Sequence, residues 1–321
     1  MSRQWRIEYP GAIYHVLSRG NNRQDIFKTD DDRHLFLELL EELSARFHIG
    51  IYACVLMSNH YHLLLQTHEK NLSRSMQWLG VTYTRRFNLN NRQSGHLFQG
   101  RFKSIIVENE TYLLRLSYYI HRNPLRAAMV KRLNDYPWSS YRYYGYAKKP
   151  PNWLKTKFIL SQCHGDNPHK IYRSKMQQYA KEESCLREDL KHGLIYGSQD
   201  FVQKIRDQYL SPEKNTELPQ HNSVFSDISP EEIVSQASEL LDFDIEKAID
   251  AKRMMSSEKD KRDFVLYLLR ELGGLSNQKI GSIFNLTYSS VSRRASDLGN
   301  RFQKEKKLFK KYQDFKSKIK I

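Results

Sequence analysis

The feature that most constrains the fold is the alternation of two apolar patterns along the first 130 residues. Short runs rich in β-branched and aromatic residues favour strands, whereas longer segments with apolar residues at every third or fourth position favour helices. The predicted strands are residues 12–17, 49–56, 60–65 and 98–107, and the predicted helices are about 30–43, 72–88 and 110–122.

The order of these elements is β-α-β-β-α-β with one further helix. The residues Met57-Ser58-Asn59 form a tight turn that joins two of the strands into a hairpin. This order is typical of a ferredoxin-like antiparallel sheet with helices packed on one face. The sequence therefore predicts an α+β fold class.

The rest of the chain divides by composition. Residues 1–150 are the predicted first domain, and residues 151–255 a helical or linker extension, in which 211–230 is polar and holds three of the nine Pro residues. Residues 256–303 contain one long apolar-periodic helix and then two short helices joined by a turn, which is the helix-turn-helix pattern. Residues 304–321 are a basic tail with eight Lys.

The charge balance points to a polyanionic partner. The chain has 52 Lys and Arg against 36 Asp and Glu, a net charge of +16, which suits nucleic acid or an acidic membrane surface. No run approaches the roughly 20 apolar residues of a membrane span, and the N-terminus lacks an apolar signal segment. The three Cys are scattered, which is typical of a reducing compartment. We therefore expect a cytoplasmic protein.

The pair His60 and His62 is the sharpest local motif. Alternate residues of a strand share a face, so both imidazoles project together while Tyr61 points into the core on the opposite face. Two such rings can hold one divalent cation, given a further ligand. The competing interpretation is two His on a half-exposed strand. Other His residues, at positions 15, 96 and 121, are expected to be structural.

A second motif surrounds Tyr119. Asn123 lies four residues later, on the same helical face, so a Tyr nucleophile and a third metal ligand could stand together. Tyr118 is the competing nucleophile; it lies about 100° around the helix from Tyr119, so only one of the two phenols can face the metal. Because Asn123 precedes Pro124, helical geometry is disfavoured there. The competing interpretation is a packed Tyr and a capping Asn.

Five ordered matches between residues 5 and 145 point to a family. They are PGAIYHV with SRGNNR at 10–16 and 18–23, MSNHYHLL at 57–64, GRFKS at 100–104, YIHRNPLRA at 119–127 and WSSY at 138–141. These segments resemble the REP-associated tyrosine transposases, a branch of the HUH single-strand DNA transposases.

The resemblance implies a fold, an activity and a site. The fold is the ferredoxin-like sheet, His60 and His62 bind Mg²⁺ or Mn²⁺, Asn123 is the third ligand by position, and Tyr119 is the nucleophile. Members of the family cut and rejoin single-stranded DNA beside imperfect hairpins through a 5′-phosphotyrosine, and they include monomers and homodimers.

Basic and polar residues are expected to contact DNA. In the matched segments these are Arg19, Arg23, Arg101 and Lys103, on phosphates or extruded bases. Residues 274–281 and 288–293 resemble the duplex-binding helix-turn-helix of the bacterial replication initiator, and would place the protein on the bacterial nucleoid. Such a helix reads the major groove, here through Ser289, Ser290, Ser292 and Arg293.

Two other functions remain open on the sequence alone. A non-catalytic regulator derived from a transposase would keep the DNA-binding surfaces and lose the chemistry. A metal phosphodiesterase acting through activated water would leave no covalent adduct and would tolerate Tyr119→Phe.

Overall fold

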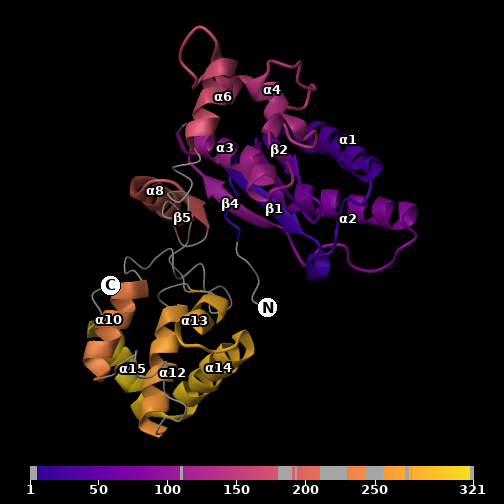
Figure 1. The fold of residues 1–321 in the computed structure, drawn as a ribbon. Coiled ribbons are helices and arrows are strands. Elements are labelled where there is room, and N and C mark those ends of the chain that lie inside the picture. Colours follow the sequence, from indigo (N-terminus) through magenta and orange to yellow (C-terminus); the bar gives the residue numbers. More distant parts are fainter. Residues whose placement is uncertain are drawn as a thin grey trace. The chain divides into compact units, whose positions relative to one another are not determined.

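The chain forms two compact units, Arg6–Ile205 and a second one that holds Arg206–Ile321, and each is considered separately (Figure 1). No described helix is long and apolar enough to cross a membrane. The structure is a computed structural model, and it describes residues 6–108, 111–179, 190–191, 194–209, 230–242, 244, 256–271, 275 and 277–318.

The first unit is built on a six-stranded sheet with the order β2-β3-β1-β4-β6-β5. Its first four strands pair antiparallel in the ferredoxin-like order, which confirms the predicted α+β class. The sheet as a whole is mixed, because β6 pairs parallel with β4. The strands are β1 (Ile13–Arg19), β2 (Ile49–Leu56), β3 (His60–Thr67), β4 (Lys103–Val107), β5 (Leu190–Lys191) and β6 (Ile195–Tyr196).

The helices of the first unit follow the predicted pattern with two shifts. The predicted strand 98–107 begins only at Lys103, and Phe98 makes a single bridge to Gly20. The predicted helix 110–122 continues to Arg126, and its first residue lies outside the described part of the chain. The helices are α1 (Asp30–Phe47), α2 (Leu72–Asn90), α3 (Thr111–Arg126), α4 (Tyr141–Gly145), α5 (Lys157–Leu160), α6 (Pro168–Gln178) and α8 (Gln199–Tyr209), with 3₁₀ turns η1 (Asn21–Arg23) and η2 (Leu133–Asp135).

Helices cover both faces of this sheet, whereas the sequence predicted helices on one face. On one face, Phe36 of α1 packs against Tyr61 of β3 and against Tyr83 of α2. On the other face, Leu64 of β3 shares a buried core with residues of α3, including Ile120. The strand periodicity therefore separates Tyr61 from its neighbours His60 and His62, as predicted.

The second face takes part of its core from beyond residue 150. Tyr172 and Met176 of α6, with Tyr179 just after it, are buried in the same cluster as α3. Residues up to 205 thus belong to the first compact unit, whereas the sequence placed a boundary at 150. Most of the predicted linker, residues 211–229, and Cys185 lie outside the described residues.

The second unit is helical around its own apolar core. Thr287 caps α14 by accepting a hydrogen bond from the backbone N–H of Ser290. The predicted basic tail is mostly helix, and Leu308 and Tyr312 pack against the core. The helices are α10 (Pro230–Leu241), α12 (Ser256–Glu271), α13 (Asn277–Ile283), α14 (Tyr288–Lys304) and α15 (Lys306–Lys318).

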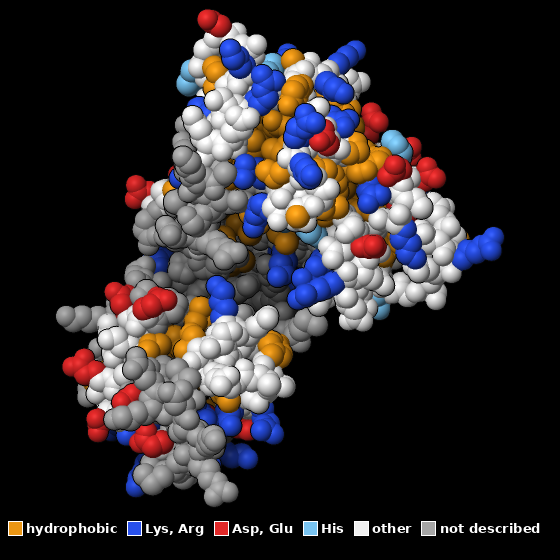
Figure 2. Space-filling model, viewed as in Figure 1, with side chains coloured by type: hydrophobic (Ala, Val, Ile, Leu, Met, Phe, Trp, Pro, Cys, Tyr) orange, Lys and Arg blue, Asp and Glu red, His pale blue; other side chains and the backbone are white. Residues whose placement is uncertain are grey.

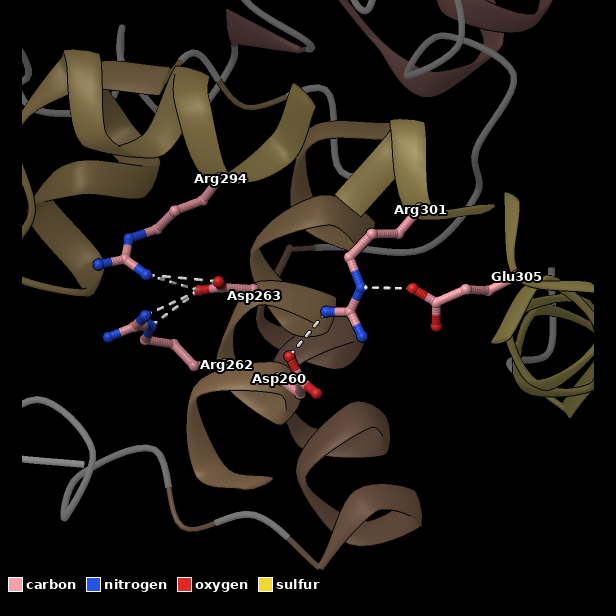
Figure 3. A network of polar contacts seen from close by, with 6 residues as sticks. All are labelled: Asp260, Arg262, Asp263, Arg294, Arg301 and Glu305. Atoms are coloured by element: carbon pink, nitrogen blue, oxygen red, sulfur yellow. Dashed lines mark hydrogen bonds and ion pairs between the residues drawn. The ribbon is translucent and has the colours of Figure 1, made fainter. Parts of the chain in front are cut away.

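A charge network ties α12 to α14 within this unit (Figure 3). Asp263 lies 2.8 Å from the guanidinium of Arg262 and 3.3 Å from that of Arg294. The Arg301 guanidinium lies 2.9 Å from Asp260 and 3.1 Å from Glu305. These Asp and Arg side chains fix the side-by-side packing of the two helices.

Candidate active site

The candidate site lies on the α3 face of the sheet, where β1 and β3 run side by side. In their register Arg19 lies opposite His60, and Leu17 lies opposite His62. Directly opposed residues share a face, so His60 and His62 project from the face that Tyr61 does not occupy. Their ring centroids are 5.1 Å apart.

His60 is oriented by its neighbour Asn59. The Nδ1 atom of His60 lies 2.7 Å from Oδ1 of Asn59. Since an amide oxygen only accepts, Nδ1 carries the proton and Nε2 keeps its lone pair. Burial, and then the charge of Arg19, lower the pKa of His60, which keeps the ring neutral.

His62 is oriented by a residue of the adjacent strand. Its Nδ1 atom lies 2.8 Å from Nε2 of His15, and the two rings stack with centroids 5.1 Å apart. Both side chains are buried. Burial lowers the pKa of His15 to about 4 and, with nearby charges, lowers the pKa of His62 well below its usual value. Both imidazoles are therefore neutral at pH 7.

Tyr119 of α3 stands over this pair of rings. Its ring centroid lies 6.0 Å from that of His62 and 6.1 Å from that of His15, edge-on in both cases. The guanidinium carbon of Arg126 lies 4.8 Å from the Tyr119 ring centroid. The phenol is half-buried, between the imidazoles and a positive charge.

Tyr118 points elsewhere. It is buried, and its ring packs against Tyr172 and Tyr179 at centroid distances of 4.8 and 5.5 Å. The two neighbouring phenols thus diverge, as the helical rotation of about 100° per residue requires. Tyr119 is the one that the structure brings to the histidines.

Asn123 is bonded back to its own helix. Its Nδ2 atom donates to the backbone carbonyls of Tyr119 and Ile120, at 3.0 and 3.2 Å. Pro124 has no N–H for the Ile120 carbonyl, and the amide of Asn123 supplies the missing donor. The expectation that the helix ends near Asn123 is therefore wrong, because a side chain repairs the backbone at Pro124. The Oδ1 atom of Asn123 is left as its candidate ligand atom.

The predicted DNA-contacting residues of the first unit are all exposed. Arg19 donates to Oε1 of Gln99 at 2.7 Å. Lys103 of β4 and His62 of β3 lie on either side of Leu17 of β1. Two strand spacings therefore separate Lys103 from His62, a distance of about 10 Å. Arg23 is the last residue of the 3₁₀ turn η1, and Arg101 lies in the loop before β4. Figure 2 shows Lys and Arg side chains spread over the visible face of this unit.

The predicted contacts of the second unit fall on two sides of α14. Ser289 and Arg293 are exposed, whereas Ser290 and Ser292 are half-buried. The Ser290 hydroxyl accepts a hydrogen bond from Thr287 at 2.9 Å. Ser289 and Arg293, four residues apart, therefore form the open face of the helix.

Two residues near the site have positions that the sequence did not predict. His15 was expected to be structural, yet it contacts a predicted metal ligand. Arg126 lies seven residues after Tyr119, which is two helical turns, and this spacing could have placed it on the same face. His121, by contrast, is buried away from Tyr119, between Tyr172 and Ser140.

The donor atoms suit a divalent cation of mixed ligation. Among the described residues, no three His, Cys, Asp or Glu side chains form a metal-binding group. Two neutral imidazoles and one amide oxygen are nevertheless acceptable ligands for a cation that takes further oxygens from water or a phosphate. The lone pair left on Nε2 of His60 fits this role.

One family model matches the part of the chain that holds the site. Residues 8–123 match the family model described as "Transposase IS200 like". No curated protein matches the chain. A solved structure of a REP-associated tyrosine transposase bound to a REP hairpin is 19% identical, with a TM-score of 0.40, over 48% of this chain and 92% of that one. The segment that matches this transposase family model, residues 8–123, holds every side chain placed around Tyr119 except Arg126.

Proposed function

We propose that this chain cuts and rejoins single-stranded DNA, with Tyr119 as the nucleophile. One observation carries the proposal: Tyr119 lies edge-on against His62 and His15, while its neighbour Tyr118 is buried in the core. A phenol held beside two neutral imidazoles and a guanidinium suits attack on a phosphate.

In the cleavage step, the Tyr119 oxygen bonds to phosphorus as the bond from phosphorus to the 3′ oxygen breaks. The phenol gives up its proton and the departing 3′ oxygen takes one up, which leaves a 5′-phosphotyrosine and a free 3′-hydroxyl. The phosphodiester energy is retained in this linkage, so a second 3′-hydroxyl can reseal the strand.

His60, His62 and Asn123 would hold Mg²⁺ or Mn²⁺ beside the phenol. When bound, the cation polarises the scissile phosphate and offsets the charge of the transition state. Arg126, whose guanidinium stacks on the Tyr119 ring, adds a fixed positive charge on the same side of the phenol.

Exposed basic residues of the first unit would hold the DNA strand. Arg19 and Lys103 share the sheet face of the histidines, so they can bind phosphates on either side of the reacting one. Arg23 of the η1 turn and Arg101 of the loop before β4 would extend this surface. The motifs around these residues resemble those of hairpin-directed transposases, and a hairpin-flanked strand is the proposed substrate.

The second unit is proposed to bind duplex DNA through α14. Ser289 and Arg293 on its open face would contact base edges, and Ser290 and Ser292, which are half-buried, would contact the DNA beside them. This unit would bring the nuclease to its target. Whether the chain acts as a monomer or homodimer, and its association with the nucleoid, stay predictions.

A covalent-adduct assay tests the proposal. Labelled single-stranded oligonucleotides from the DNA flanking the gene are incubated with the full chain and Mn²⁺ or EDTA, then resolved on a denaturing gel. We expect a Mn²⁺-dependent shifted band that disappears in Tyr119→Phe and persists in the matched control Tyr118→Phe. Tight binding without any adduct supports the regulator, and cleavage that survives Tyr119→Phe supports the phosphodiesterase.

A further inference from the structure

The geometry points to His15 as a positioning residue that holds His62 in the tautomer required of a metal ligand. This inference rests on the proposed metal-dependent function. The observation behind it is the 2.8 Å contact between His62 Nδ1 and His15 Nε2.

The direction of that hydrogen bond follows from the ligand role. Of two ring nitrogens in contact, one must donate and the other accept. If His62 binds the cation through Nε2, its proton lies on Nδ1 and it donates to Nε2 of His15. His15 must then carry its own proton on Nδ1. The bond thus selects one tautomer in each ring.

The surroundings of His15 keep its ring in place. On β1 it lies between Leu64 of β3 and Ile105 of β4, and the Tyr119 ring covers it from α3. Its side chain is 5% exposed. In this apolar setting no bulk water replaces the bond when it is lost, so His62 Nδ1 would stay unpaired or change tautomer.

The two histidines of the pair are supported in the same manner. Each has its Nδ1 engaged by one neighbour: Asn59 Oδ1 at 2.7 Å for His60, and His15 Nε2 at 2.8 Å for His62. A partner on the far nitrogen of a ligating imidazole is the usual support of such ligands. Asn59 is half-buried at the edge of the site, whereas His15 supports His62 from inside the protein.

The same contact argues against His15 as a ligand of the cation. Its Nε2 is turned toward the Nδ1 of His62, not toward the Nε2 side on which His62 would bind the ion. No three-His group with ligand geometry exists among the residues that the structure describes. His15 therefore acts through His62.

Mn²⁺ binding to the full chain without DNA tests this role. Loss of such a supporting residue typically weakens metal affinity about 10–100-fold. His15→Phe keeps the ring volume but has no acceptor, and His15→Gln keeps an acceptor at lower reach. We expect the Kd for Mn²⁺, followed by electron paramagnetic resonance of the free ion, to rise about 10–100-fold in His15→Phe and less in His15→Gln.

The matched control is His169→Phe, which removes a half-buried His of α6 that hydrogen-bonds to the Tyr144 carbonyl rather than to α3. It should lower the melting temperature and leave Mn²⁺ affinity unchanged. Electron spin-echo modulation should count the same number of imidazole ligands on Mn²⁺ in the native chain and in His15→Gln.

Three results overturn the inference. The first is a folded His15→Phe variant that binds Mn²⁺ as tightly as the native chain. The second applies if His15→Phe does not fold, and is a His15→Gln variant with native Mn²⁺ affinity. The third is a His15→Gln variant whose bound Mn²⁺ has one imidazole ligand fewer than in the native chain. Failure of the native chain to bind Mn²⁺, or an adduct that forms equally in EDTA, is a different outcome: it removes the proposed metal site first, and the role of His15 with it.

Discussion

In α3 the side chain of Asn123 supplies the hydrogen bond that Pro124 cannot donate to the helix backbone. This substitution of one donor for another can be tested as an energetic coupling between Asn123 and Pro124. The Ile120 carbonyl has no backbone donor because residue 124 is Pro, and the Asn123 amide donates to it at 3.2 Å. In Asn123→Ala this carbonyl loses its donor. In Asn123→Ala combined with Pro124→Ala, the new N–H of residue 124 can bond to it instead.

The expected magnitudes follow from the burial of the helix. An unsatisfied buried acceptor costs about 1–3 kcal/mol, and Asn123 is 8% exposed. The Tyr119 carbonyl also accepts a hydrogen bond from the Asn123 side chain. In Asn123→Ala it still accepts the helical hydrogen bond from the backbone N–H of residue 123, so losing the side-chain bond adds little to the cost. We expect Asn123→Ala to cost about 2 kcal/mol beside Pro124 and about 1 kcal/mol less in the Pro124→Ala background, since ordinary hydrogen bonds contribute about 1 kcal/mol.

Tryptophan fluorescence during urea unfolding isolates the relevant unit. The chain has four Trp, at 5, 78, 138 and 153, and the last three lie in the first unit. With Trp5→Phe introduced into every variant, the transition seen by this probe reports that unit. Equal costs of Asn123→Ala in the two backgrounds would refute the repair, and so would an Asn123→Ala variant as stable as its parent.

Three further outcomes follow from other contacts. Asp263→Asn leaves two guanidinium groups without their carboxylate, and should destabilise the second unit by about 2–3 kcal/mol in calorimetry, whereas Asp260→Asn, whose side chain is 55% exposed, should cost under about 1 kcal/mol. Arg126→Gln should slow adduct formation about 10–100-fold and Arg126→Lys less, with the exposed Arg132→Gln unchanged; equal rates in all three would exclude a role for the guanidinium. Because burial lowers the pKa of His121 to about 3, unfolding below about pH 6.5 takes up a proton, and the free energy of unfolding falls there by up to about 1.4 kcal/mol per pH unit. His121→Phe should reduce this pH dependence in urea unfolding at pH 4–7, and an unchanged pH dependence would assign it to other groups.

The sequence predicted those parts of the site that depend on local periodicity. His60 and His62 share a face because a strand repeats every two residues, and Tyr119 separates from Tyr118 because a helix turns about 100° per residue. The family resemblance, confirmed for residues 8–123, added the expected roles. These roles remain predictions until the adduct assay is done.

The parts that escaped prediction depend on pairing and on side chains. His15 joins the site only through the register of β1 with β3, and a shift of one residue would turn it to the opposite face. Propensity treats Pro124 as a helix breaker, since it does not include an amide side chain that bonds to the preceding turn. The parallel partner β6 has two residues, too few to show any period.

The position of His121 sets a practical limit on which fragments of this chain can fold. Its two ring nitrogens join α3 to Ser140, just before α4, and to Tyr172 of α6, and Tyr118 packs on the same part of α6. The helix that presents Tyr119 is thus anchored by residues well beyond the end of the family match at residue 123, as far as Tyr172. A fragment that ends at residue 123 or 150 would keep every predicted ligand and the proposed nucleophile. It would nevertheless lose α6, whose Tyr172 packs against Tyr118 and hydrogen-bonds to His121 of α3. Truncations meant to isolate the first unit should therefore keep all residues up to 205, and substitutions in α6 should alter the position of Tyr119 without touching bound DNA.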